Sequence, residues 1–402
     1  MKCFWPFLCL IVVAPVYSAD WPQWLGPNRD SISTETVKPW KGELKVLWTQ
    51  SVGPGHSSPV VSRGKVYLHA RVKDKDEESL SAFDAVTGKP FWSTAYPRGK
   101  FGTLFGTGPQ ATPAVSDDRV FTFGPTGFLT AFDASTGTKL WQVDSEKDFK
   151  PKRLFFGAAC SPLVDAKKVV VNIGAKSASI VAFSTDKGEP IWKTLDDPAS
   201  YSSGIRFGQQ LVFLTQQGLR GLDAHHGGQK WEYKLVDKLD ESSTTPVVVG
   251  DLLLASSITQ GMAGLRRTSY GVEEVWKNKE LTCYFSTPVP VGDKYVFVVT
   301  GKLGVGVSST LHCVELATGK ILWSKPKVGS YHAAMLRTAD NRLLFLSDFG
   351  DLILLDPNPK EYVELARSKV TKNGGIWAHP ALANGKVYIR DDRNLICIEL
   401  PK

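Results

Sequence analysis

Short runs of apolar residues, separated by glycine, proline and aspartate, recur along almost the whole chain. Lys65–His69 and Lys294–Thr300 are typical, since β-branched and aromatic residues alternate there with smaller or polar ones, and the turn Arg63-Gly64 precedes the first. Runs of this length and composition, bounded by turn residues, are strands and hairpins and not helices. The pattern therefore predicts an all-β chain.

The strands belong to a repeat, because an eleven-residue segment that ends in tryptophan occurs six times. The first copy, Ala82–Trp92, reads AFDAVTGKPFW. The others are Ala131–Trp141, Ala182–Trp192, Gly221–Trp231, Arg266–Trp276 and Cys313–Trp323. A seventh tryptophan, Trp48, ends the run Leu44–Trp48, and consecutive tryptophans lie 39 to 51 residues apart. A period of about 40–50 residues is typical of a four-stranded propeller blade.

Each unit has the same internal order. A Ser/Thr-Pro pair such as Ser58-Pro59 precedes the first strand, and an Ala-x-Asp segment with a Thr-Gly turn leads to the tryptophan. The aspartate can cap the turn and the glycine supplies its positive φ. The tryptophan has a large apolar body and one N–H that needs a partner, which suits a wedge between blades. We assign this structural role to Trp48, Trp92, Trp141, Trp192, Trp231, Trp276 and Trp323.

Two further units lack the tryptophan and bring the count of blades to eight. The last unit stops after its third strand, Leu395–Leu400, whereas Leu44–Trp48 is an unpartnered fourth strand at the other end of the chain. Pairing these two strands would complete the eighth blade and remove the open edges of the ring. The sequence thus predicts an eight-bladed β-propeller over residues 44–402, closed by its N-terminal strand.

The repeat resembles the PQQ-like (quinoprotein-type) propeller repeat. The positions that match its Ala-x-Asp-x-x-Thr-Gly-Lys-x-x-Trp motif in the first copy are Ala82, Asp84, Thr87, Gly88, Lys89 and Trp92. The segment Asp20–Asp30 also resembles the leader of many secreted PQQ-like proteins of planctomycete type. We therefore assign residues 20–43 to an N-terminal leader segment.

The resemblance implies one of two functional classes. Quinoprotein dehydrogenases hold PQQ and calcium in the funnel and typically carry an adjacent Cys-Cys pair. The branch that includes the β-barrel assembly lipoprotein BamB has no cofactor and serves as an interaction scaffold. This sequence has neither a Cys-Cys pair nor a Cys-x-x-Cys-His haem motif, which favours a non-catalytic scaffold without a cofactor. The alternative is a PQQ-dependent dehydrogenase of alcohols or sugars, and a third option is a hydrolase or lyase with an improvised funnel site.

The N-terminus predicts export. Lys2 is the only charge before Asp20, and Cys3–Val16 is almost wholly apolar. This pattern is typical of a signal peptide, residues 1–19, with cleavage after Ser18 or Ala19. The run is too short for a transmembrane segment, so we expect a periplasmic or secreted protein, and a monomer. The net charge of +8 is spread along the chain without a Lys/Arg block and gives no indication of a nucleic-acid partner.

Motifs of known chemistry are missing from the sequence. It contains no Gly-x-Ser-x-Gly, His-Glu-x-x-His, EF-hand loop or Walker A motif, and the four cysteines after the signal peptide are too scattered for a metal knuckle. We predict no metal site. The acidic run Asp74–Glu78 is interpreted as a solvated loop, His225-His226 as an exposed turn, and Gly301–Gly306 as a hairpin loop.

Alignment of the units on their first strands gives a candidate site. The innermost strands of a propeller surround its axis, so the positions three residues before each proline, or its equivalent, should ring one mouth of the channel. Polar or aromatic residues at these positions are His56, Gln110, Tyr201, Phe285, His332 and Trp377. We predict that they bind a protein or peptide partner, and that His332 and His56 make binding pH-sensitive, because the pKa of histidine is ordinarily about 6.5.

Two alternatives to this site stay open. The same side chains could pack a plugged channel, which would give them a structural role. The partner surface could also lie on the loops that lead into the second and third units, because exposed apolar patches usually mark contacts. The aromatic residues of those loops are Phe101, Phe105, Phe155 and Phe156.

Overall fold

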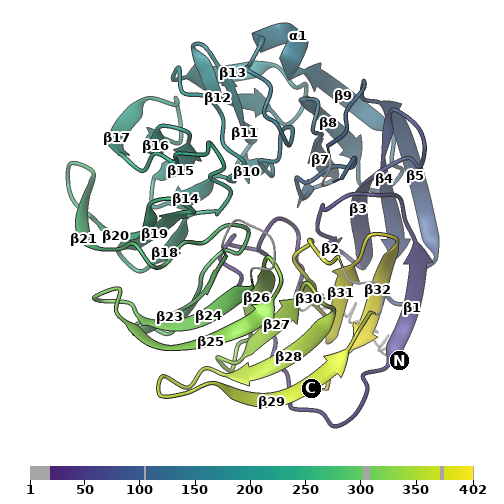
Figure 1. Ribbon diagram of the computed structural model, residues 1–402. Helices are drawn as coiled ribbons and strands as arrows, with labels where there is room; N and C mark the ends of the chain where they lie inside the picture. The colour runs from purple at the N-terminus through teal and green to yellow at the C-terminus, as the bar shows by residue number, and fades with distance from the viewer. Residues whose placement is uncertain (1–18, 104–105, 302–307, 372–374, 402) are drawn as a thin grey trace, which may run out of the picture.

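The structure, a computed structural model, describes residues 19–103, 106–301, 308–371 and 375–401. Within these ranges, thirty-two strands form eight four-stranded antiparallel sheets, which are arranged as blades around a centre (Figure 1). One short helix accompanies them. The prediction of an all-β, eight-bladed propeller is confirmed. Three sequence-based expectations lie outside the described residues: the signal peptide up to residue 18, Phe105, and residues 302–306 of the glycine-rich segment.

The first four blades follow one another along the chain. Blade 1 contains β2 (Val60–Ser62), β3 (Lys65–Arg71), β4 (Glu77–Asp84) and β5 (Pro90–Pro97). Blade 2 contains β6 (Ala114–Ser116), β7 (Arg119–Phe123), β8 (Phe128–Asp133) and β9 (Lys139–Asp144). Blade 3 contains β10 (Leu163–Asp165), β11 (Lys168–Ala175), β12 (Ala178–Ser184) and β13 (Pro190–Thr194). Blade 4 contains β14 (Ile205–Phe207), β15 (Gln210–Thr215), β16 (Gly218–Asp223) and β17 (Gln229–Tyr233).

The next three blades have the same order. Blade 5 contains β18 (Val247–Val249), β19 (Leu252–Ser257), β20 (Gly261–Arg267) and β21 (Val272–Asn278). Blade 6 contains β22 (Val289–Val291), β23 (Tyr295–Thr300), β24 (Ser309–Glu315) and β25 (Ile321–Gly329). Blade 7 contains β26 (Ala333–Arg337), β27 (Leu343–Ser347), β28 (Asp351–Asp356) and β29 (Val363–Lys369).

Blade 8 is built from both ends of the chain. It contains β30 (Ala381–Ala383), β31 (Lys386–Arg390), β32 (Asn394–Glu399) and, as its outer strand, β1 (Val46–Ser51). Strand β1 runs antiparallel to β32, with Trp48 opposite Cys397 and Ser51 opposite Asn394. The predicted closure of the ring by the N-terminal strand is therefore confirmed, and Figure 1 shows β1 beside β32.

The one helix among the described residues is α1 (Ser145–Phe149), which the sequence pattern did not predict. It follows directly after β9, and the carboxylate of Asp144 accepts a hydrogen bond from the Lys147 N–H at 3.0 Å. Such a cap satisfies a free N–H of the first turn and stabilises the helix. In the described part of the chain no helix has the length and apolarity that crossing a bilayer requires.

The hydrophobic core lies between adjacent blades and not at the axis. Leu80 and Ala82 of blade 1, for example, pack with Val120 and Phe132 of blade 2 in one buried cluster. Alternation along each inner strand supplies side chains to both neighbouring gaps, because successive residues of a strand point to opposite faces. Each blade is therefore held by the two blades beside it.

The repeated tryptophans lie against the glycine turn of the following blade. In the first turn the Asp84 carboxylate accepts hydrogen bonds from the Val86 and Thr87 N–H groups at 3.1 and 2.6 Å, and Gly88 has a φ of 73°. A Cβ atom on Gly88 would lie 2.6 Å from the ring of Trp48, so the ring and the glycine are in close contact. The other pairs of this kind are Trp92 with Gly137, Trp141 with Gly188, Trp192 with Gly227, and Trp276 with Gly319.

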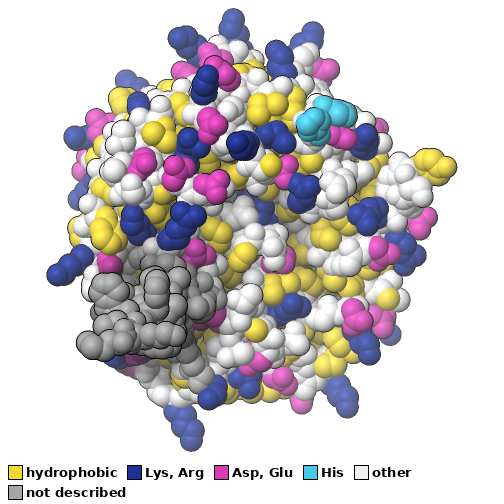
Figure 2. Space-filling model, turned by 180° about the vertical axis from the view of Figure 1, so that it is seen from behind, with side chains coloured by type: hydrophobic (Ala, Val, Ile, Leu, Met, Phe, Trp, Pro, Cys, Tyr) yellow, Lys and Arg dark blue, Asp and Glu magenta, His cyan; other side chains and the backbone are white. Residues whose placement is uncertain are grey.

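The leader segment crosses one face of the ring, behind the centre in Figure 1. Trp21 exchanges two backbone hydrogen bonds of 2.8 Å with Val61 of blade 1. Further along, Ser33 donates to Arg337 O of blade 7, and Lys38 donates to Pro401 O at the end of blade 8. The leader thus fastens the first blade to the last two. Seen from behind, this face carries acidic and basic side chains interspersed (Figure 2).

Candidate functional site

The leader also enters the channel. Arg29 is only 3% exposed, and its guanidinium donates to the carbonyls of Ser161 and Pro162 of blade 3 at 3.1 and 2.9 Å. Trp24 Nε1 donates to Thr245 Oγ1 of blade 5 at 2.9 Å, and the Trp24 ring lies edge-on to His379 of blade 8, 5.8 Å away. Blades 3, 5 and 8 lie on different sides of the ring, so a segment that contacts all of them lies across its axis.

Hydrogen bonds to serine and threonine hydroxyl groups join neighbouring blades near the start of their first strands. The Ser or Thr before the proline that opens one blade accepts a hydrogen bond from the backbone of the preceding blade. His379 N donates to Ser58 Oγ at 2.8 Å, Ser58 N to Thr112 Oγ1 at 3.1 Å, and Thr112 N to Ser161 Oγ at 2.9 Å. The Ser/Thr-Pro pairs are visible in the sequence, but their role in linking blades was not predicted.

Trp377 is the centre of an aromatic cluster that is built from the loops before the innermost strands. Its ring stacks on His332 with 4.9 Å between centroids and on His56 with 5.4 Å, and Phe285 meets it edge-on at 5.4 Å. Tyr331 stacks on the same ring at 6.0 Å and is 43% exposed. We call these five residues the mouth cluster. Its members come from the loops before blades 1, 6, 7 and 8.

The other two predicted residues, Tyr201 and Gln110, do not contact the mouth cluster. The ring of Tyr201 contacts Phe156 edge-on at 5.5 Å, and Phe155, which is 67% exposed, lies 4.9 Å from Phe156. Gln110 is half-buried and belongs to neither group of rings. Four of the six predicted residues thus contact one another around Trp377, and their role in binding stays a prediction. The sequence analysis did not single out Tyr331, the most exposed member of the mouth cluster.

The two histidines of the mouth cluster do not titrate near neutrality. Burial, with the nearby positive charges of Arg390 and His332, lowers the pKa of His56 to about 3. Burial lowers the pKa of His332 to about 4. Both rings are neutral above roughly pH 5. The expected pH sensitivity at about 6.5 is therefore wrong, because the sequence alone does not show that packing against Trp377 removes these rings from water.

Acid should destabilise the fold through His332. Its folded pKa lies below the ordinary value of 6.5, so the unfolded chain binds more protons between pH 6.5 and 4, and stability present above pH 6.5 is lost as the pH falls. We expect the free energy of unfolding to drop by up to about 3 kcal/mol over this range on account of His332. Urea unfolding at a series of pH values measures the slope.

The matched variants are His332→Gln and His226→Gln. His226 lies in an exposed turn, with 61% of its side chain accessible, as predicted, so its replacement should leave the slope as in the parent protein. His332→Gln should make the profile between pH 6.5 and 4 less steep, and the remaining slope comes from the other buried histidines, such as His56. An unchanged slope in His332→Gln would contradict the assignment.

Glu78 corrects the interpretation of the acidic run as a solvated loop. Its side chain is fully buried. The carboxylate lies 3.2 Å from His69 Nε2, accepts a hydrogen bond from Tyr96 Oη at 3.2 Å and pairs with the buried Arg98 at 3.6 Å. Strand β4 begins at Glu77, inside the run that was interpreted as a loop, and alternation then points Glu78 into the gap between blades 1 and 2. Among the described residues, no three His, Cys, Asp or Glu side chains gather as they would to hold a metal ion.

Comparison with known proteins identifies the family. A family model described as outer membrane protein assembly factor BamB matches residues 43–103, 76–325 and 273–400. The chain belongs to this family of PQQ-like propellers. The outer membrane protein assembly factor BamB of Shewanella oneidensis is 22% identical over 302 residues, which cover 70% of this chain and 73% of that protein. A quinohemoprotein alcohol dehydrogenase of Comamonas testosteroni is 26% identical over 203 residues, which cover 48% of this chain and 28% of the enzyme.

Solved structures from both functional classes share the fold of this chain. BamB of Moraxella catarrhalis superposes with a TM-score of 0.63 at 16% identity, over 89% of this BamB-family chain and 98% of that one. The Comamonas testosteroni quinohemoprotein alcohol dehydrogenase superposes with a TM-score of 0.70 at 13% identity, over 95% and 81% of the two chains. At such identities the likeness shows the fold alone, so function rests on the site.

Proposed function

We propose that this protein is an exported, non-catalytic interaction scaffold of the BamB type, and that it contacts a protein partner through the mouth cluster. Support comes from the match to the BamB family along almost the whole chain. The relatives that match over most of their length are outer membrane protein assembly factors. We place its site of action in the periplasm or outside the cell, in line with the N-terminal sequence.

The observation that carries the proposal is the exposed aromatic surface around Trp377. Tyr331 stacks on Trp377 and is 43% exposed, and Trp377 and Phe285 are themselves only partly buried. Exposed rings that are already held by their neighbours contribute contact area without much loss of side-chain freedom, and aromatic residues dominate the energetics of protein interfaces. Because the two histidines are neutral, such an interface carries no charge from them.

The quinoprotein alternative requires a quinone tricarboxylate and a calcium ion in the funnel, and the residues present do not fit these groups. Arg390, a buried cation whose charge acts on His56, donates to the carbonyls of Gly53, Ser57 and His69 at 2.7 to 3.1 Å, which leaves its guanidinium committed to the protein. Both faces of a quinone also need space, whereas Trp377 already stacks on three rings. These contacts favour the scaffold.

Photo-crosslinking tests the proposal. Tyr331→p-benzoylphenylalanine should form an adduct with a protein partner in the native host, because the side chain faces solvent at the mouth. Phe91→p-benzoylphenylalanine is the matched control, since Phe91 is 53% exposed on outer strand β5, away from the mouth. Trp377→Ala should weaken binding of the purified partner by about thirtyfold or more, as expected for a central aromatic anchor.

Two results would overturn the proposal. Adducts at Phe91 and none at Tyr331 would move the interface to the outer strands. Dehydrogenase turnover after loading with PQQ and calcium would show an enzyme in place of a scaffold.

A further inference from the structure

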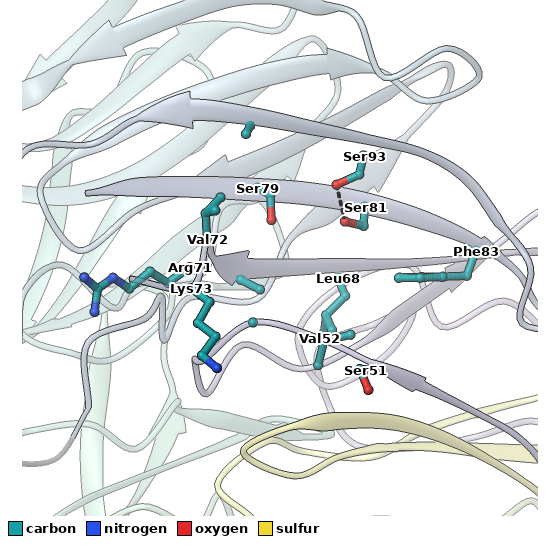
Figure 3. Close-up of a pocket in the computed structure, with 13 residues that line it drawn as sticks. Ser51, Val52, Leu68, Arg71, Val72, Lys73, Ser79, Ser81, Phe83 and Ser93 are labelled. Atoms are coloured by element: carbon teal, nitrogen blue, oxygen red, sulfur yellow. Dashed lines mark hydrogen bonds between the residues drawn. The ribbon is translucent and has the colours of Figure 1, made fainter. Parts of the chain in front are cut away.

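A groove lies at the seam where the ring closes. It is bounded by the end of β1, in blade 8, and by β3, β4 and β5 of blade 1 (Figure 3). Its volume is about 430 Å³, within the range of roughly 300–1,000 Å³ that is usual for small-molecule sites. The groove is separate from the mouth cluster, and none of its lining residues belongs to that cluster.

The groove exists because blade 1 turns short side chains toward blade 8. In the register of the sheet, Ser81 lies beside Leu68 on one strand and Ser93 on the other, and Ser79 lies opposite Ala95. In blade 7, the residues at the corresponding three positions are Phe345, Ile353 and Arg367. Large side chains fill that position in blade 7, whereas serine and alanine leave it open in blade 1.

The lining has a defined chemistry. Hydroxyl groups come from both sides of the seam, with Ser51 on β1 and the hydrogen-bonded pair Ser81 and Ser93, whose oxygens are 2.8 Å apart. Leu68 and Phe83 provide an apolar wall, which Figure 3 shows next to these hydroxyls. A serine hydroxyl both donates and accepts, so the groove can bond to hydroxyl groups of a ligand while its apolar wall packs against C–H groups.

The charge of the lining is positive. No aspartate or glutamate lines the groove, whereas Arg71 and Lys73 do. The guanidinium of Arg71 donates a hydrogen bond to Lys75 O at 2.8 Å and forms an ion pair with Asp76 at 3.9 Å. The Lys73 side chain extends toward the segment that carries Val52 (Figure 3), and it forms no ion pair with any other residue that the structure describes. Lys73 is therefore the cation that a bound anion would meet.

We propose that the seam groove binds a small hydroxylated carboxylate of the sugar-acid class. The carboxylate pairs with Lys73, the ligand hydroxyls bond to Ser51, Ser81 and Ser93, and the C–H face of the ligand packs on Phe83. Such a ligand contacts the N-terminal strand and blade 1 at once. Because it binds the closed ring, it should also stabilise the fold in proportion to its occupancy.

Calorimetric titration with D-glucuronate, with D-glucose as its neutral twin, tests the site on the full exported chain. We expect saturable binding of glucuronate, with affinity at least about tenfold above that of glucose, since a charge-assisted hydrogen bond is lost with the carboxylate. Glucuronate should also raise the unfolding temperature, and glucose much less. Equal binding of the two sugars, or no saturable binding of glucuronate to the folded protein, would overturn the proposal.

Substitutions in the lining test whether the ligand binds in the groove. Lys73→Gln should weaken glucuronate binding about ten- to a hundredfold, and Ser81→Leu should block it by filling the groove. Lys75→Gln is the control, because Lys75 lies in the same loop and its ammonium pairs with Glu77 at 3.8 Å outside the groove. The exposed Lys73 can change without disturbing the core, so binding that survives Lys73→Gln in a folded protein would contradict the site.

Discussion

Deletion of residues 20–48 is expected to open the ring. It removes the leader from the channel together with the part of β1 that carries Trp48, which pairs with Cys397 of β32 and packs beneath Gly88 of blade 1. The loss leaves β32 as an exposed edge and removes the contact between the last blade and the first. We expect a loss of more than about 5 kcal/mol, comparable to the net stability of a typical domain. Urea unfolding and the sedimentation coefficient measure the two consequences.

A shorter deletion separates the two parts of this effect. Removing residues 20–43 takes away the leader, including the buried Arg29, but keeps β1 and thus the closed eighth blade. This variant should sediment as a compact ring and unfold at a lower urea concentration than the parent protein. If the longer deletion were as stable and compact as the shorter one, closure by β1 would contribute little.

The repeat made the ring predictable because its signals are local. The period of the tryptophans gives the length of one blade, two further units without the tryptophan bring the count to eight, and the missing fourth strand after Leu400 points to Leu44–Trp48 at the other end of the chain. The turn between Asp84 and Gly88 was predictable for the same reason, since its cap and its positive φ depend on adjacent residues. Information of this kind does not require knowledge of distant contacts.

The channel and the site depend on contacts that no local pattern shows. The leader has no repeat, so the sequence does not show that Arg29 donates to blade 3. Alignment on the prolines did place His332, Trp377 and His56 together, because the blades repeat at equal angles. It did not show the depth to which these rings are packed, which is what lowers the pKa of both histidines, nor that Tyr331 covers them.

Replacement of Trp92 by alanine is expected to cost about 3–5 kcal/mol, the usual range for loss of a large aromatic side chain from between packed elements, because the half-buried ring is wedged between two blades. The ring lies between Tyr67 of its own blade, 5.9 Å away between centroids, and the glycine turn of blade 2, where a Cβ on Gly137 would come within 2.4 Å of it. Phe91→Ala is the matched control, because Phe91 is the preceding residue on β5 and is 53% exposed. It should change stability by no more than about 0.5 kcal/mol.

Phenylalanine substitutions at Trp92 and Trp141 separate the contribution of packing from that of the indole hydrogen bond. The indole N–H of Trp92 is buried without a hydrogen-bond partner in the described part of the chain, whereas Trp141 Nε1 donates to Thr185 O of the next blade at 3.0 Å. Phenylalanine keeps most of the apolar body and removes the N–H. Trp141→Phe should therefore cost about 1 kcal/mol more than Trp92→Phe, the net contribution of one hydrogen bond with its acceptor left unpaired. Urea midpoints at constant slope measure the difference. If Trp92→Ala unfolded at the same midpoint as Phe91→Ala, the tryptophans would not hold the blades together, and closure would rest on the leader and β1.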